Sequence, residues 1–406
     1  MDTPTPLIRL DVTAGDLHGE IARLRALGPA VRVELPGGVP AWAITRHQVL
    51  QDLLADPRVL KDASNWAALR DGQIPEGWPL IAFITNRGMT TADGADHLRL
   101  RTLVTQAFTP RRINAMRPRV EALTHRLLDA LTAHPSGPVD LRAHFAYPLP
   151  MHVIGDLLGV PEEHFDQFRA LSASLTSSTT SPEETLATKR QLHAMLADLV
   201  ARRRERPGED LTSHLIAARD QGDRLSEDEL TGTLILILVA GHGTTLNLIT
   251  NAVRALLTHP EQLAAVTAGR QTWSAVIEET LRWDSPVGHF PLRYAGDDLR
   301  VGDTVIPKGE AILASYAAAG RDPGQFGADA DEFDTTRSAS RHLSFGHGAH
   351  YCLGAALARL EAEIALPALF ARFPHLDLAV PPQELAPLPS FVSNSVQTLP
   401  VLLHRT

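Results

Sequence analysis

The sequence predicts a mainly α-helical fold with small β-sheets, an α+β class, and three observations support this prediction. From about residue 97 to 280, apolar side chains recur at helical spacing almost throughout, with Pro and Gly as breaks. Alternating apolar and polar residues over 31–44, and again over about 287–315, are typical of short strands. The 406 residues contain no internal repeat, linker or low-complexity tract, so we expect one domain over 1–406.

The first elements of the chain are predicted to be a helix and a β-hairpin. Over 15–27, one helical face is expected to carry Leu17, Ile21, Leu24 and Leu27. The alternating pattern that follows is interrupted at Pro36-Gly37-Gly38, a sequence that favours a turn between two strands.

The last part of the chain is predicted to be mixed. Ile306-Pro307-Lys308-Gly309 favours a turn among the strands of 287–315. A helix is expected over 353–373, where apolar residues again recur at helical spacing, and the proline-rich stretch 376–404 is expected to be irregular.

Charge and hydropathy narrow the class of protein. With 38 Lys and Arg against 47 Asp and Glu, the formal charge is −9, which argues against nucleic acid or an anionic membrane as a partner. The N-terminus MDTPTPLIRLD has no basic or apolar signal region. The longest apolar run, 234–240, is far shorter than the roughly 20 residues of a membrane span. We expect a cytoplasmic protein.

The single cysteine, Cys352, excludes an internal disulfide and any multi-cysteine metal cluster. A lone cysteine is most often a small buried hydrophobe. A zinc site with His347 and His350 is a second interpretation, but three ligands within six residues form a poor tetrahedral site. The third interpretation is a thiolate ligand to haem iron.

The residues around Cys352 favour the thiolate. It lies at the start of the helix predicted over 353–373, where free N–H groups and the helix dipole lower the pKa of a thiol. Gly348 and Gly354 leave room for a flat macrocycle near the backbone, and Phe345 can cover the sulfur.

The run FGHGAHYCLGAALARLE, from Phe345 onward, fits the pattern Phe-x-x-Gly-x-His-x-Cys-x-Gly and resembles the cytochrome P-450 family of haem-thiolate monooxygenases. The likeness covers nearly the whole chain. It implies the P-450 fold, with a long helix crossing over the haem. It also implies heme b as cofactor, Cys352 as its metal ligand, and Phe345 and Gly346 at the cofactor.

Two further family elements match. Glu279 and Arg282, three apart on a helix, correspond to a structural ion pair of the family, and Arg337 is expected as a third partner. His97 and Arg101 share a helix face and match the family's haem-propionate pair, and the resemblance adds Arg293 and His350 as propionate ligands.

The overhead helix is expected at about 228–257. Ala240 and Gly241 leave space there for dioxygen and substrate, and Thr244 can donate to the carbonyl of Ala240 and bend the helix. In the family this threonine stabilises the activated oxygen.

The chain departs from the family at Gly243, where an acid that relays protons is usual. Protons would then come through water and Thr244, or a substrate hydroxyl would assist, or the enzyme would run well only with peroxide. A second departure, Gly320 in place of the more usual Asn, predicts a local change only.

The resemblance implies a monomeric monooxygenase of secondary metabolism. It would hydroxylate a large hydrophobic substrate such as a steroid, macrolactone or other polycyclic metabolite, with O2 and electrons from NAD(P)H through ferredoxin reductase and ferredoxin. Arg111 and Arg112 are candidates for contact with the donor. Pocket candidates by position are Met89, Ala240, Val287, Phe290 and Phe391.

Two alternatives stay open. Gly243 favours a haem-thiolate enzyme of another reaction type, such as oxidative coupling or peroxide-driven oxidation. A non-catalytic haem-binding protein is the other alternative, against which Thr244 and the small residues at 240–241 speak.

Overall fold

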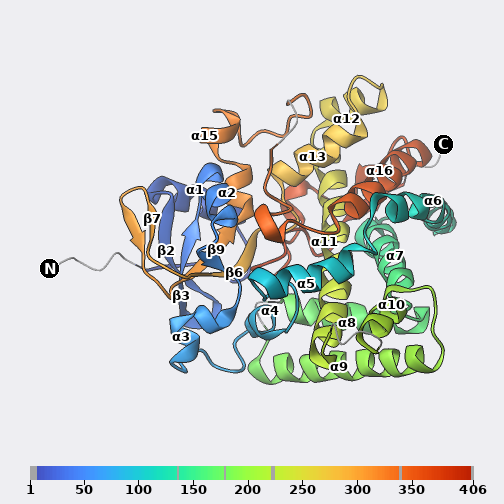
Figure 1. Ribbon diagram of the computed structural model, residues 1–406. Helices are drawn as coiled ribbons and strands as arrows, with labels where there is room; N and C mark the ends of the chain where they lie inside the picture. The colour runs from blue at the N-terminus through green and yellow to red at the C-terminus, as the bar shows by residue number, and fades with distance from the viewer. Residues whose placement is uncertain (1–6, 135–136, 178–179, 221–224, 338–340, 404–406) are drawn as a thin grey trace.

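Most of the helices lie on one side of the molecule, and the largest sheet lies on the other together with a few helices (Figure 1). The computed structural model describes residues 7–134, 137–177, 180–220, 225–337 and 341–403. The α-helices are α1 (Leu17–Leu27), α2 (His47–Ala55), α3 (Ala67–Arg70), α4 (Ile81–Thr85), α5 (Gly94–Thr105), α6 (Pro110–Ala133), α7 (Pro148–Leu158), α8 (Phe165–Thr176), α9 (Pro182–Glu205), α10 (Leu211–Asp220), α11 (Glu227–Thr258), α12 (Pro260–Thr267), α13 (Trp273–Trp283), α14 (Tyr316–Gly320), α15 (Pro323–Phe326) and α16 (Ala355–Arg372). Short helical turns include η3 (Arg142–Ala146) and η5 (Gly348–His350).

The strands form three sheets. They are β1 (Ile8–Arg9), β2 (Ala30–Leu35), β3 (Val39–Ile44), β4 (Val59–Leu60), β5 (Val139–Asp140), β6 (His289–Ala295), β7 (Leu299–Val301), β8 (Thr304–Ile306), β9 (Ala311–Ser315), β10 (Asp377–Leu378) and β11 (Pro400–Leu402). The largest sheet has the order β1-β2-β3-β9-β6-β4, and the smaller ones are β10-β11-β5 and β7-β8.

The sheets join distant parts of the chain, which the sequence did not predict. The expected hairpin is present as β2 and β3, and the strands of 287–315 are present as β6 to β9. The two predicted groups of strands belong to one sheet, because β3 pairs in parallel with β9 and Trp42 lies opposite Ile312. The stretch 376–404 was expected to be irregular, yet β10 and β11 pair there and β11 adds β5 from mid-chain.

α11 is the centre of the helical side, where it packs against α7, α13 and α16 (Figure 1). It starts within one residue of the prediction because Ser226 and Glu229 form a capping box, in which each side chain bonds the backbone N–H of the other. It is the one described helix long and apolar enough to cross a membrane, and 61% of its most apolar window is buried inside the fold.

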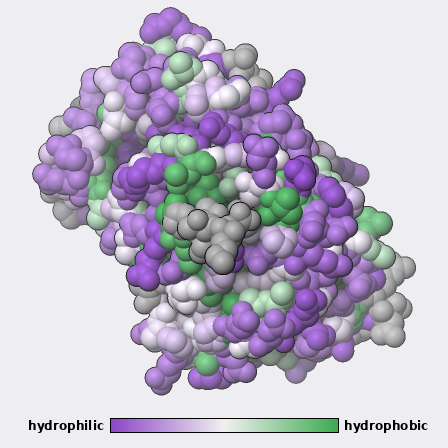
Figure 2. Space-filling model, turned by 90° about the vertical axis from the view of Figure 1, so that its left-hand side faces the viewer, coloured by the Kyte–Doolittle hydropathy of each residue, from purple (hydrophilic) through white to green (hydrophobic). Residues whose placement is uncertain are grey.

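The face of the molecule that carries the sheets is mostly hydrophilic, with hydrophobic residues gathered near the middle of the view (Figure 2). This agrees with the acidic formal charge of −9.

Candidate active site

The cysteine loop runs through η5 into α16. Its geometry is fixed by the Cys352 amide, which donates to the carbonyl of Phe345 at 2.8 Å. Gly346 and Gly348 have φ of +71° and +69°, a left-handed conformation that favours glycine. A Cβ on Gly348 would lie 2.6 Å from the carbonyl oxygen of Leu54, whereas a Cβ on Gly354 would meet nothing. Room near the backbone is therefore left at Gly354, and Gly348 instead lets the loop approach α2.

Cys352 is solvent-accessible at the end of this loop, although protein atoms surround its sulfur closely enough to desolvate it. Burial raises its pKa, and the N–H groups of Gly354 and Ala355, with the charges of Arg101 and Arg359, oppose this rise. The predicted lowering by the helix start is thus present but smaller than the effect of burial. A bound metal cation would supply the missing stabilisation of the thiolate.

The Phe345 ring packs against an ion-pair network that the sequence did not suggest. The guanidinium of Arg359 lies 4.5 Å from the centroid of the Phe345 ring and donates to both carboxylate oxygens of Glu278, at 2.6 and 2.9 Å. His342 contacts the same carboxylate at 3.1 Å. Burial alone would raise the pKa of Glu278, but the bonds from Arg359 and His342 outweigh it and lower the pKa to about 2.

The four predicted propionate ligands converge from α5, β6 and η5. The ring centroids of His97 and His350 are 4.1 Å apart, and Arg101 donates to the carbonyl of Tyr351 at 2.7 Å. Burial and the nearby charges of Arg293 and other cations lower the pKa of His350 to about 2.

This cluster has too few anions among the described residues. The buried Nε2 of His97 has no hydrogen-bond partner. Asp93 is the one carboxylate nearby, 4.0 Å from His350, and it already accepts from the backbone N–H groups of Lys61 and Asp62. A ligand with two carboxylates, such as haem, fits this donor set.

Lys61 is a fifth basic residue of the cluster, and sequence reasoning missed it. It is 4% exposed, and its ammonium donates to the carbonyl of Leu292 at 2.8 Å and lies 5.1 Å from the Phe290 ring centroid. Burial and Arg293 hold its pKa well below the usual value. A lone lysine beside a two-residue strand carries no signal of burial in the sequence.

Glu279 and Arg282 form a buried bidentate pair with two bonds of 2.7 Å. Arg282 also donates to three backbone carbonyls, and Arg337 lies 3.4 Å from Glu279, as the predicted third partner. A Cβ on Gly320 would lie 2.1 Å from the carbonyl oxygen of Arg282, so this glycine lets its loop pack onto the pair.

On α11, the predicted bond from Thr244 to the carbonyl of Ala240 is present at 2.7 Å. The space expected at Gly241 is not there, because a Cβ at this position would lie 2.4 Å from Ile154 of α7. A Cβ on Gly243 would meet nothing within 4 Å. The open notch therefore lies at Ala240 and Gly243, and Gly241 serves helix packing.

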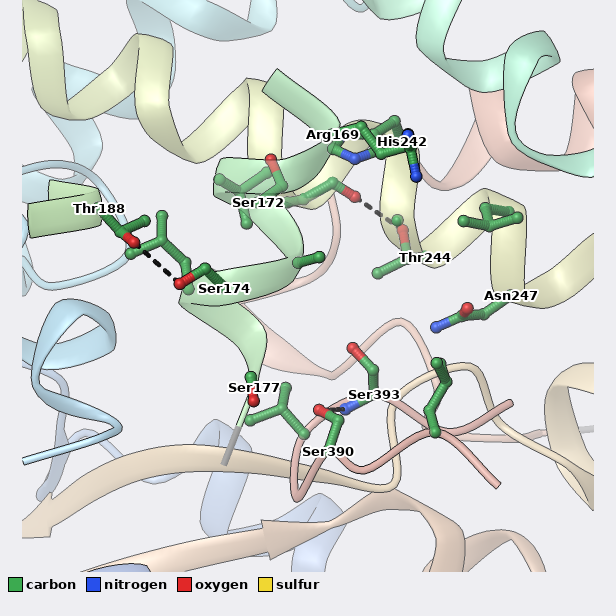
Figure 3. Close-up of a pocket in the computed structure, with 18 of the residues that line it drawn as sticks. Arg169, Ser172, Ser174, Ser177, Thr188, His242, Thr244, Asn247, Ser390 and Ser393 are labelled. Atoms are coloured by element: carbon green, nitrogen blue, oxygen red, sulfur yellow. Dashed lines mark hydrogen bonds between the residues drawn. The ribbon is translucent and has the colours of Figure 1, made fainter. Parts of the chain in front are cut away.

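A cavity of about 1010 Å³ lies beside this face of α11 and is bordered by α8, α9 and the segment 388–397 (Figure 3). Ala240, Gly243, Thr244, Val287 and Phe290 line it. The other two pocket candidates do not: Met89 is packed in the helical core, and Phe391 is buried against His289 while its neighbours Ser390 and Val392 reach the cavity.

The cavity wall is mainly apolar, as the sequence suggested, but polar side chains are interspersed along it. They come from several elements and include Arg142, Arg169, Ser172, Ser174, Thr188, His242, Asn247, Ser390 and Ser393 (Figure 3). Their positions along the chain gave no signal, since they converge only in the fold.

Comparisons with known proteins agree on one family. Residues 182–398 match the family described as Cytochrome P450. The chain is 45% identical to 2-hydroxy-5-methyl-1-naphthoate 7-hydroxylase of Streptomyces carzinostaticus, over 97% of each chain. It is 51% identical to CYP154C4 from Streptomyces sp. W2061, with a TM-score of 0.96 over 98% of each chain. A CYP154C4 structure from Streptomyces sp. ATCC 11861, described as testerone bound, is 50% identical with a TM-score of 0.96, again over 98% of each chain.

Proposed function

The chain belongs to the cytochrome P450 family and is a haem monooxygenase, and we propose that its substrate is a large polycyclic molecule, a steroid or an aromatic polyketide-like metabolite. The observation that carries this proposal is the cavity of about 1010 Å³ that Thr244 and the open notch at Gly243 line. A cavity of this size accepts a rigid molecule of several fused rings. Macrolactones are the largest substrates that the proposal includes.

The relatives support this substrate class. One is named for hydroxylation of a methylnaphthoate, and another is described with a steroid bound. Both ligands are fused-ring compounds with oxygen substituents, which suits a cavity with both apolar and hydroxyl-bearing walls.

The residues proposed to hold the haem are Cys352 at the iron and His97, Arg101, Arg293 and His350 at the propionates. When bound, the haem activates dioxygen so that one oxygen atom enters a C–H bond. Phe345 and Gly346 shape the loop that presents Cys352, and Phe345 is proposed to keep water from the sulfur.

Thr244 is proposed to hold a proton donor near the site of oxidation. Because its hydroxyl hydrogen is given to the Ala240 carbonyl, its lone pairs remain free to accept a hydrogen bond from water or substrate. The neighbouring position supplies no acid, because it is Gly243 and the space beside it is open. We propose that cavity water, held by Thr244, carries the protons.

Electrons are proposed to come from NAD(P)H through a ferredoxin reductase and a ferredoxin. Arg111 and Arg112, both exposed on the first turn of α6, remain candidates for donor contact. A cytoplasmic, monomeric protein folded as one domain is part of the same proposal, supported by the charge of −9.

Carbon monoxide binding to the reduced holoenzyme tests the haem assignment. Thiolate ligation should give the strongly red-shifted Soret band that the family shows, and Cys352→His should lose that shift while still binding haem. A wild-type spectrum without the shift, in folded and haem-loaded protein, would remove the thiolate assignment. Spin-state titrations with steroids, hydroxynaphthoates and macrolactones then test the substrate class.

A peroxide-driven oxidase is the second candidate, and the open space at Gly243 favours it. Gly243→Glu places an acid where nothing obstructs it, with Gly243→Gln as the matched uncharged control. If proton supply limits the wild type, the Glu variant should form more product per NAD(P)H consumed than the Gln variant. Equal coupling in all three proteins, with efficient turnover by peroxide alone, would favour the oxidase.

A further inference from the structure

His242 is a buried polar residue of α11 for which the proposed mechanism gives no use. It is 4% exposed and lines the cavity. In Figure 3 it lies with Arg169 at the edge of the cavity opposite Ser390 and Ser393. Its Nδ1 is 2.7 Å from the carbonyl oxygen of Leu238, one turn earlier on the helix.

This contact sets the tautomer of the ring. A carbonyl oxygen can only accept, so Nδ1 carries the hydrogen and donates. Burial lowers the pKa of His242, which keeps the ring neutral near pH 7. In a neutral imidazole with its hydrogen on Nδ1, Nε2 has a lone pair and accepts a hydrogen bond.

Nothing among the described residues donates to this Nε2. The Tyr147 ring lies at 6.4 Å, edge-on, and its hydroxyl is committed to the carbonyl of Phe165 at 3.1 Å. Arg169 lies over the Tyr147 ring at 5.3 Å and pairs with Asp166 at 3.5 Å. Buried polar groups are almost always paired, so an acceptor left open on a cavity wall points to a donor from the ligand.

We infer that His242 is a specificity-determining residue, whose Nε2 accepts a hydrogen bond from a hydroxyl group of the substrate. The inference rests on the proposed function in taking this cavity as the substrate site. It narrows the substrate class to fused-ring molecules that carry an alcohol or a phenol. A ketone at the same place would set its own acceptor against Nε2 and leave both unpaired.

Pairs of ligands that differ at one hydroxyl test whether the site prefers a hydroxyl to a group that cannot donate. Testosterone carries a hydroxyl where androstenedione carries a ketone, and 2-naphthol carries a hydroxyl where 2-methoxynaphthalene has none. A buried acceptor that is left without a donor weakens binding by roughly fivefold to a hundredfold. We therefore expect a hydroxyl steroid, and 2-naphthol, to bind the wild type more tightly than their partners by about that factor.

Two variants test His242 itself by equilibrium dialysis of the holoenzyme, which needs no spectral change. His242→Asn keeps a donor near the position of Nδ1 but removes the acceptor at Nε2, so the hydroxyl preference should vanish. His242→Gln can place an amide oxygen near the position of Nε2, so part of the preference should remain.

A hydroxyl preference that survives in His242→Asn, or equal binding of both partners by the wild type, would overturn the inference. The carbon monoxide spectrum tests the haem site without involving His242. A lost preference with an intact spectrum therefore concerns this inference, and a failed spectrum concerns the proposed function.

Discussion

Gly241 and Gly243 are two residues apart on α11, yet Gly241 packs against α7 whereas Gly243 faces open space. Helical spacing places both near Ala240, so the sequence correctly marked a stretch of small residues but misassigned the space to Gly241. The contact with Ile154 sets which face of α11 packs against α7. A contact between two helices cannot be read from a local sequence pattern. For the same reason, His242 was not singled out. Its proposed role depends on its position in the cavity wall, which no sequence motif marks.

Alanine at these two positions should have opposite effects on the unfolding of the holoenzyme. Gly241→Ala forces a Cβ against Ile154 and should destabilise by about 1 to 3 kcal/mol, as overpacking does. Gly243→Ala meets nothing and should gain up to about 1 kcal/mol from helix propensity. Thermal unfolding of both variants measures this, and a shift of the same sign in both would contradict the assignment of the notch.

At the scale of elements, local pairs were predictable and converging clusters were not. Glu279 and Arg282 sit three apart on α13, so their contact follows from helix geometry alone. The proposed propionate ligands could be named only through family resemblance. Lys61, beside β4, was found neither by helix geometry nor by the resemblance. Its position depends on the pairing of β4 with β6, which brings it to Leu292 and Phe290.

The Glu279 and Arg282 pair should be sensitive to loss of one partner. Glu279→Gln leaves the buried charge of Arg282 without its carboxylate and should destabilise by about 3 to 5 kcal/mol. The pair of Arg9 and Glu34 serves as a control, because the Arg9 side chain is 80% exposed and Glu34→Gln should cost less than about 1 kcal/mol. Comparable losses in thermal unfolding of the two variants would argue against a supporting role for the buried pair.

Lys61→Met should weaken the hold on haem. It removes a buried cation next to Arg293, so transfer of haem to apomyoglobin should become roughly tenfold faster, the usual effect of losing one charged hydrogen bond. Lys308→Met, at an exposed lysine, is the control and should leave the rate unchanged. Unaltered haem transfer in Lys61→Met would show that this ammonium serves only its bond to Leu292.

At the scale of the whole molecule, the histidines that burial keeps neutral should make the free energy of unfolding depend on pH. Burial lowers the pKa of His18, His47, His97, His193, His242, His289 and His350. A lowered pKa means that the unfolded chain binds more protons in this range. Stability should therefore fall as the pH drops below about 6.5.

His289 gives the sharpest test. Burial lowers its pKa from 6.5 to about 4, and neither ring nitrogen has a hydrogen-bond partner among the residues that the structure describes. Between those two values its contribution should decline by roughly 1 kcal/mol per pH unit as the pH falls. His289→Phe, which keeps an aromatic ring against Phe391, should lose less thermal stability between pH 7.5 and pH 5.5 than wild type does. His375→Phe, at an exposed site, should behave as wild type, and an unchanged acid response in His289→Phe would exclude this origin.

The pairing of β3 with β9 and of β5 with β11 has a consequence for synthesis on the ribosome. The early hairpin must wait, with an unpaired edge, until residues 311–315 emerge, and β5 waits for 400–402. Cys352 also lies near the end of the chain. The nascent protein therefore acquires its cofactor site and its closed sheets almost together, after most of its helices exist, and early release would leave exposed strand edges prone to aggregation.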